Sequence, residues 1–153
     1  MLLKTTGQDA SCGAAGLEDR LRNAQSPIPV LVVDDDDDTR DSLRLLLEYA
    51  HHPVAEAASA AAALDYLRST SAGHVVLLDF LMPVEHAGTL LHAVEQDASL
   101  RRHCYVLIPT TPVTAFPEED QRLIREQCTA VVLKPFNVDD ALRTVDAAAA
   151  QLP

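Results

Sequence analysis

Four apolar runs in this chain are each followed by residues that could do chemistry. Five aspartates, 34–38, follow the first run, Asp79 ends the second, Thr110 and Thr111 follow the third, and Lys134 follows the fourth. Two or three carboxylates with room for water commonly hold Mg²⁺ in proteins. A hydroxyl and a single ammonium suit the oxygens of a dianionic group. Together these residue types are typical of phosphoryl transfer, with a carboxylate as nucleophile and a divalent ion to neutralise charge.

The runs that carry these residues predict the strands of a parallel sheet. Short, continuous apolar runs indicate strands buried on both faces, and we expect five, over 29–33, 53–57, 75–79, 105–108 and 130–133. Helix-spaced apolar residues separate them, at about 39–50, 60–67, 87–94, 117–127 and 138–152, with Ser59 and Asn137 as expected N-caps. This alternation predicts an α/β fold, a doubly wound five-stranded parallel sheet of order 2-1-3-4-5.

That strand order brings the chemistry to one place. The first and third strands become neighbours at the topological switch point, so Asp34, Asp35 and Asp79 converge in one crevice. One aspartate of the acidic run can cap the following helix, but adjacent carboxylates repel one another. A solvated acidic loop would also account for the run, and a bound cation is the better account of it.

Composition limits the domain organisation and the partners. The 153 residues predict one folded domain over 29–153, preceded by a leader, 1–28, that is disordered or forms a short helix near 14–23. The net charge of −11 disfavours binding to nucleic acid. No run reaches the length of a membrane span, and the three cysteines have no metal or disulfide pattern, so we expect a cytoplasmic protein.

Residues 29–150 resemble the receiver domain of bacterial two-component response regulators. The matching segments are Leu31–Asp35, Leu77–Asp79 followed by Met82 and Pro83, Thr110, and Lys134–Phe136. The resemblance implies a flavodoxin-like receiver fold and a phosphorelay function. It implies a phosphoprotein that signals, with no enzyme activity beyond its own phosphorylation from phosphodonors and autodephosphorylation.

The same resemblance implies a role for each acidic residue. Asp79 would accept a phosphoryl group from a sensor histidine kinase or a histidine phosphotransfer protein. Asp35 and Asp79 would bind Mg²⁺ directly, together with the backbone carbonyl of Leu81. Asp34 would assist through water.

The remaining site residues follow from the resemblance in the same way. Lys134 would pair with the phosphoryl group, and the Lys134–Pro135 peptide would be cis. Thr110 would be the switch hydroxyl, although Thr110 and Thr111 could exchange places in the alignment. No output domain follows the last helix, so a single-domain regulator would act by contact with a downstream protein. Its partner or dimer face would be the helix after Pro117, the fifth strand and the last helix.

Several positions depart from the receiver pattern. Gly88 comes five residues after Pro83 instead of four, Pro109 removes a backbone donor beside Thr110, and Val131 stands where receivers carry an aromatic switch residue. These departures keep open a receiver-like binding module that is never phosphorylated.

A second alternative is an enzyme. Asp35-x-Asp37-x-Thr39 after an apolar strand also fits haloacid-dehalogenase-like, Mg²⁺-dependent phosphatases, with Asp35 as nucleophile and Asp139-Asp140 as the late acidic pair. A nucleophile at Asp35 instead of Asp79 would distinguish this enzyme from a receiver.

Overall fold

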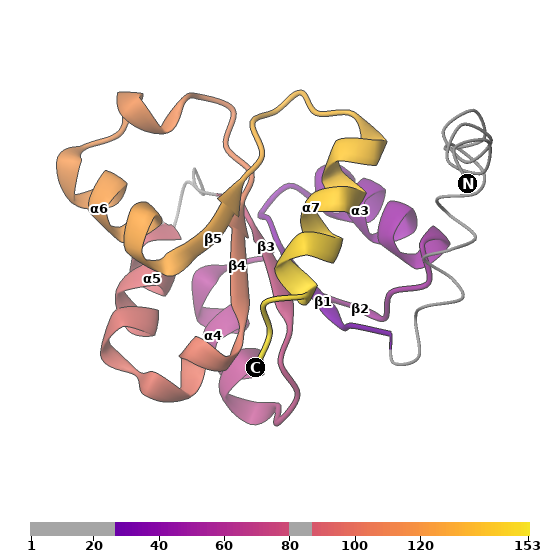
Figure 1. Ribbon diagram of the computed structural model, residues 1–153, viewed down its shortest axis with the longest axis horizontal. Coiled ribbons are helices and arrows are strands. Elements are labelled where there is room, and N and C mark those ends of the chain that lie inside the picture. Colours follow the sequence, from indigo (N-terminus) through magenta and orange to yellow (C-terminus); the bar gives the residue numbers. More distant parts are fainter. Residues whose placement is uncertain (1–26, 80–86) are drawn as a thin grey trace, which may run out of the picture.

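A computed structural model describes residues 27–79 and 87–153, which form a parallel sheet with helices on both faces (Figure 1). The strands are β1 (Val30–Val33), β2 (Val54–Ala57), β3 (Val75–Leu78), β4 (Cys104–Leu107) and β5 (Cys128–Val131). Their order is β2-β1-β3-β4-β5, and every neighbouring pair is parallel. The predicted strand order is therefore confirmed. Residues 1–26 of the predicted leader, 1–28, lie outside the described residues, so the conformation of the leader stays a prediction.

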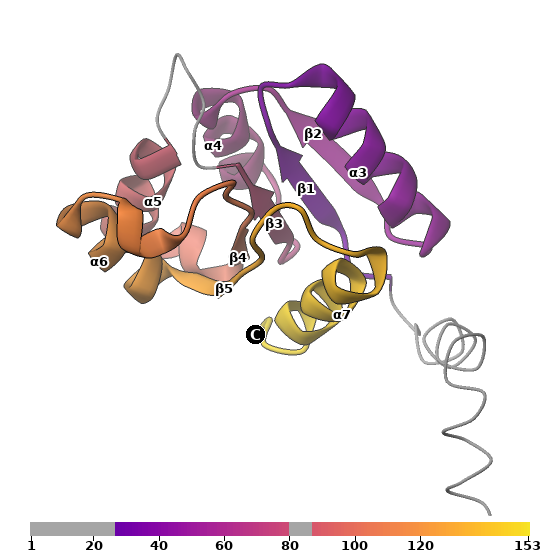
Figure 2. The same cartoon turned by 90° about the horizontal axis from the view of Figure 1, so that it is seen from above.

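The described ranges contain five α-helices and two short 3₁₀ helices, which lie between the strands except for the last helix, which follows β5. They are α3 (Asp37–Tyr49), α4 (Ala60–Ser69), α5 (Ala87–Gln96), η1 (Ala98–Arg102), η2 (Val113–Ala115), α6 (Glu118–Gln127) and α7 (Val138–Ala149). Seen from above, α3 and α7 lie on one face of the sheet, and α4, α5 and α6 lie on the other (Figure 2). No helix among the described residues is long and apolar enough to cross a membrane.

Helices α3, α4 and α7 begin at side chains that satisfy their first free N–H groups. Asp36 accepts a hydrogen bond from the Thr39 N–H at 2.8 Å, and Ser59 accepts one from the Ala62 N–H at 3.1 Å. Asn137 caps α7 in the same way. The caps predicted from the sequence are confirmed. Pro117 precedes α6 as its cap residue and is not the first residue of the helix.

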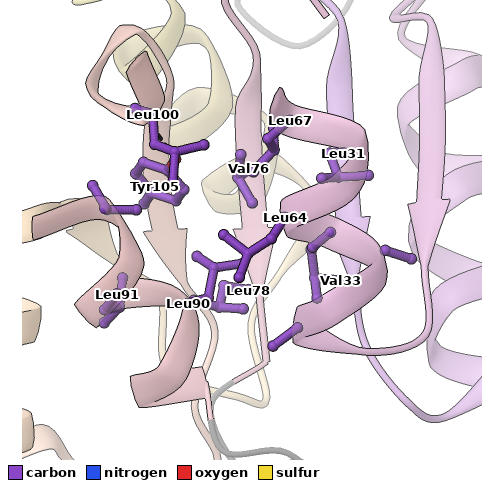
Figure 3. Packing of buried hydrophobic residues seen from close by; sticks show 14 of the residues in the cluster. Leu31, Val33, Leu64, Leu67, Val76, Leu78, Leu90, Leu91, Leu100 and Tyr105 are labelled. Carbon is purple, nitrogen blue, oxygen red and sulfur yellow. Dashed lines mark hydrogen bonds between the residues drawn. The ribbon is translucent and has the colours of Figure 1, made fainter. Parts of the chain in front are cut away.

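The core has two halves because alternate strand residues face opposite sides of the sheet. In β1, Leu31 and Val33 join the cluster under α4, α5 and α6, whereas Val30 and Val32 join the cluster under α3 and α7. Figure 3 shows the first cluster, with Leu64 of α4 beside strand and α5 side chains. Each fully buried leucine contributes roughly 1.5–3 kcal/mol to the free energy of unfolding. The rigid sheet that results fixes where the strand ends lie.

Strand β5 differs from its prediction. It covers Cys128–Val131 and not 130–133, and it follows α6 without a loop. The regular ladder between β4 and β5 ends early because the next main-chain donor toward β5 would come from residue 109. That residue is a proline and has no N–H to donate. The backbones still stay paired on the carbonyl side, since Val132 N–H donates to Leu107 and Lys134 N–H donates to Pro109, both at 2.8 Å.

Candidate functional site

Three carboxylates meet at the carboxyl edge of the sheet, as the strand order predicted. Oxygen atoms of Asp34, Asp35 and Asp79 all lie within 4.8 Å of one another. Asp34 follows β1 and Asp79 follows β3, and these strands are neighbours. Main-chain hydrogen bonds continue the ladder into the site, since Asp79 N–H donates to Val33 at 2.9 Å. The rigid centre of the sheet thus places the carboxylates.

The three carboxylates differ in burial and in their partners. Asp34 is only 3% exposed, Asp79 is partly buried and Asp35 is exposed. Asp34 Oδ1 accepts a hydrogen bond from the Asp36 N–H at 2.9 Å, and Asp34 Oδ2 lies 3.6 Å from the Lys134 ammonium. Such contacts offset the cost of removing a carboxylate from water. The exposed side of the group leaves room for water.

The other residues of the acidic run belong to the start of α3. Asp36 caps the helix, and the hydroxyl and N–H of Thr39, which both donate to its carboxylate, lower the pKa of Asp36. Asp37 bonds to Arg40 at 2.6 Å. The acidic run therefore divides into two carboxylates at the site and others that stabilise the helix N-terminus.

This division argues against the phosphatase alternative. Such a site needs Asp35 and Asp37 side by side, yet the Asp37 side chain is 85% exposed and is held by Arg40. The Thr39 hydroxyl is committed to Asp36. The proposed late acidic pair lies in the first turn of α7, where Asp140 bonds to Asn137 and Arg143. The residues of that motif do not form one site.

Lys134 follows the edge strand β5 and reaches the carboxylates across the carboxyl ends of β4 and β3. Its main chain is anchored to Pro109 on β4's extension, and the Lys134–Pro135 peptide is cis, as the resemblance implied. Its side chain is 22% exposed and ends beside Asp34. The lysine is therefore at the predicted site, although the partner found there is a carboxylate.

The two threonines are both exposed after β4. Thr110 lines an open surface hollow of about 810 Å³ whose walls include Lys134. The other lining residues are Asp38, Thr39, Ser42, Leu43, Leu46, Pro135, Phe136 and Val138. Thr111 is not among these described lining residues. Which of the two threonines is the switch hydroxyl stays a prediction.

Two predictions concern the connection after β3. The carbonyl of Leu81 falls in the segment 80–86, outside the described residues, so its role as a metal ligand stays a prediction. Gly88 lies in the first turn of α5 (Ala87–Gln96) and is buried, so the helix predicted from residue 87 is confirmed. The extra residue expected between Pro83 and Gly88 falls in the same segment outside the described residues and stays a prediction.

Two features of the molecule were not predicted from the sequence. Arg40 donates to the main-chain carbonyl of Asp34 at 2.8 Å, and only its spacing of three residues from Asp37 hinted at a local contact. At the opposite edge of the sheet, His74 and His103 are buried, with the His103 ring accepting the His74 N–H at 3.0 Å. Nothing in the local sequence distinguishes these histidines from exposed ones.

Comparison with known proteins agrees with this geometry. Residues 30–146 match the family described as the response regulator receiver domain. A search of curated proteins found no match. Among solved structures, the chemotaxis protein CheY4 of Vibrio cholerae is 23% identical, with a TM-score of 0.69, over 80% of this chain and 99% of that one.

Two further structures share the fold. A CheY-like receiver domain protein from Methanospirillum hungatei JF-1 is 23% identical, with a TM-score of 0.66, over 80% of this chain and 94% of its own. The response regulator TrrA of Thermotoga maritima, solved in complex with Mg²⁺ and BeF, is 20% identical, with a TM-score of 0.67, over 79% and 98% of the two chains. Because the family match spans well over half of the sequence, this chain belongs to the response regulator receiver domain family, the signalling module of two-component systems.

Proposed function

We propose that this receiver accepts a phosphoryl group on Asp79 and signals through protein contacts. The observation that carries the proposal is the convergence of Asp34, Asp35 and Asp79, with Lys134 beside them. We assign the nucleophile to Asp79 because it alone follows the central strand β3, opposite the acidic pair that follows β1. Asp34 is buried, and Asp35 lies at the exposed edge.

The residues present fit a magnesium ion. Mg²⁺ prefers oxygen ligands, keeps several waters and is usually held by one or two carboxylates, which a partly exposed group of three carboxylates provides. Asp35 and Asp79 would bind it directly and Asp34 through water. When bound, the ion would neutralise charge on the phosphoryl oxygens as the transfer proceeds.

The chemistry required of the chain is a single displacement. A carboxylate oxygen of Asp79 attacks the phosphorus of a phosphohistidine or a small acyl phosphate, and a new P–O bond forms. The bond from phosphorus to the donor breaks, and its electron pair leaves with the donor nitrogen or oxygen. Lys134 would turn from Asp34 to the new phosphoryl oxygens, and the Thr110 hydroxyl would donate to another. Water later hydrolyses the acyl phosphate.

The proposed donors are a sensor histidine kinase or a histidine phosphotransfer protein, and the proposed output is a downstream protein in the cytoplasm. For that contact we favour the surface of α6, β5 and α7, which includes Val131 and Leu133, exposed by 42% and 45%. Exposed apolar side chains of this kind are more often found at protein interfaces than elsewhere on the surface. The same surface is our proposal for a homodimer.

The proposal is tested with beryllium fluoride, a phosphoryl mimic, followed by ¹⁹F NMR. Wild-type protein should give a bound fluoride signal that needs Mg²⁺ and disappears on chelation. Asp79→Asn should give none, whereas Asp41→Asn, the same change at an exposed position of α3 that pairs with Arg44, should behave as wild type. Binding that survives Asp79→Asn would contradict the assignment. A folded wild type that binds no mimic would favour the unphosphorylated binding module, a reading suggested by Val131 in place of an aromatic.

A further inference from the structure

Arg40 is fixed by three acceptors from three parts of the chain. Its Nη1 donates to the Asp34 carbonyl at 2.8 Å, its Nη2 to Asp37 at 2.6 Å and its Nε to Glu56 of β2 at 3.3 Å. The side chain is only 16% exposed. A planar guanidinium can serve three acceptors at once, which a lysine ammonium on a flexible stem does less well.

The contact with the Asp34 carbonyl matters because of where that carbonyl lies. It belongs to the peptide that joins Asp34 to Asp35, two of the three carboxylates at the site. A peptide unit is planar, so a fixed carbonyl also fixes the direction in which the chain enters Asp35. The Asp36 N–H bonds to Asp34 Oδ1 at 2.9 Å, and the two bonds together hold the turn that carries both side chains.

Arg40 approaches this turn from the side opposite to Lys134. Its partner Glu56 lies on β2, next to Ala57, whose carbonyl accepts the Asp34 N–H at 3.1 Å. Lys134 comes from the β5 side and contacts the Asp34 side chain. Strand β2 and strand β5 are the two edges of the sheet. The turn that carries Asp34 and Asp35 is therefore held from both sides. Arg40 binds its main-chain carbonyl, and Lys134 pairs with the Asp34 carboxylate.

We propose that Arg40 is a positioning residue for the cation site, holding the Asp34–Asp35 peptide so that the carboxylates present a ready-made set of oxygens. This inference rests on the proposed function, because it assumes that the three carboxylates bind a divalent ion. Arg40 does not touch the ion in this account. It acts through the main chain of a residue at the site.

Positioning and simple electrostatics predict opposite results when Arg40 is replaced. If Arg40 acted only through its charge, removing it would make the acidic region more negative and would tighten cation binding by roughly two- to five-fold. If Arg40 orders the turn, its loss should weaken binding by about ten-fold, the lower end of the range seen when groups that orient metal ligands are removed. The sign of the change decides between the two.

The experiment uses Mn²⁺ as the probe, because free Mn²⁺ is measured directly by its EPR signal. The full chain is compared with Arg40→Gln, Arg40→Lys and Arg44→Gln. Arg44 is the matched control, since it lies one turn further along α3 and also pairs with Glu56, at 3.4 Å, together with Asp41 and Glu48. These three partners are all carboxylates outside the turn of Asp34 and Asp35. Arg44→Gln thus removes the same charge without touching the Asp34 carbonyl.

We expect Arg40→Gln to bind Mn²⁺ about ten-fold more weakly than wild type, and Arg44→Gln to bind equally or slightly more tightly. Arg40→Lys should also be weakened, by at least about three-fold, although it keeps the charge. It is the deciding variant if Arg40→Gln does not fold. Equal or tighter binding by Arg40→Gln, or wild-type binding by Arg40→Lys, would overturn the role of Arg40. A wild type without Mn²⁺ affinity would instead contradict the proposed function, and the inference with it.

Discussion

The Lys134 ammonium lies 3.6 Å from the carboxylate of Asp34, although the two residues follow strands that are not neighbours. Lys134 follows β5 and Asp34 follows β1, with β4 and β3 between them (Figure 1). The lysine side chain therefore extends across the carboxyl ends of the strands that lie between β5 and β1. The ammonium therefore pairs with a carboxylate that would also attract a divalent cation.

Replacing Lys134 should for this reason strengthen metal binding. Lys134→Met removes the competing cation, so we expect Mg²⁺ to bind several-fold more tightly. Without metal, the buried Asp34 loses a partner, and the free energy of unfolding should fall by about 1–2 kcal/mol, a modest value because Lys134 remains partly solvated. Thermal melts in EDTA and in Mg²⁺ measure both effects, since a ligand that binds the folded chain stabilises it by an amount that rises with the logarithm of its affinity.

Lys134→Arg is the control, because it keeps the positive charge and should leave both melting temperatures near those of wild type. A smaller Mg²⁺-induced rise in melting temperature for Lys134→Met than for wild type would show that the lysine assists the cation and does not compete with it.

His103 should make the fold sensitive to mild acid. The pKa of His103 is lowered to about 4. Burial is the largest cause, a hydrogen bond to the Leu67 carbonyl opposes it, and the nearby His74 and Arg102 add to the lowering. Its Nδ1 accepts the His74 N–H, which a protonated ring could not do. The unfolded chain, with an ordinary histidine pKa near 6.5, takes up the proton first as the pH falls. Stability is thus complete above about pH 6.5 and is lost as the pH falls toward 4.

Between pH 6.5 and 5 this residue should cost the fold about 1.5 kcal/mol, measured by urea unfolding at several pH values. His103→Asn keeps an acceptor for the His74 N–H and should remove most of that slope. His92→Asn, at a half-exposed site, should not change it. An undiminished slope in His103→Asn would assign the acid sensitivity to other groups.

The response to a phosphoryl group should be confined to a short segment. Val131 has no ring to change rotamer and is stiff at χ1, so the conformational signal must travel through Thr110, Lys134 and their loops. Amide chemical shifts on adding beryllium fluoride and Mg²⁺ should change mainly over residues 110–117 and at the start of α6. Val131→Tyr should extend the changes into β5 and α7. Large shifts along α7 in wild type, with 110–117 quiet, would contradict this account of the switch.

The parts of this molecule that follow from local rules were predictable, and those that depend on distant pairing were not. Apolar runs predicted the strands, and their alternation with helices predicted the strand order. The meeting of Asp34, Asp35 and Asp79 followed from that order, because parallel strands present their carboxyl ends together. Side-chain caps gave the helix starts, because a cap is satisfied within three residues.

The end of β5 at Val131 was missed because it is set by the neighbouring strand. An apolar run marks burial, whereas the ladder of β5 depends on donors from β4, which Pro109 interrupts. The contacts of Arg40 with the Asp34 carbonyl and with Glu56 were missed for a related reason. They depend on the distance between a helix and two strands, which no spacing within one helix records.

The most direct test of the central claim is the intact mass of the protein after incubation with acetyl phosphate and Mg²⁺. Wild type should gain the mass of one phosphoryl group, and the gain should be lost on chelation of Mg²⁺. Asp79→Asn should gain nothing, while Asp41→Asn should be modified as wild type is. An Asp79→Asn protein that still gains one phosphoryl mass, or a folded wild type that never gains it, would contradict the account of Asp79 as the phosphoacceptor.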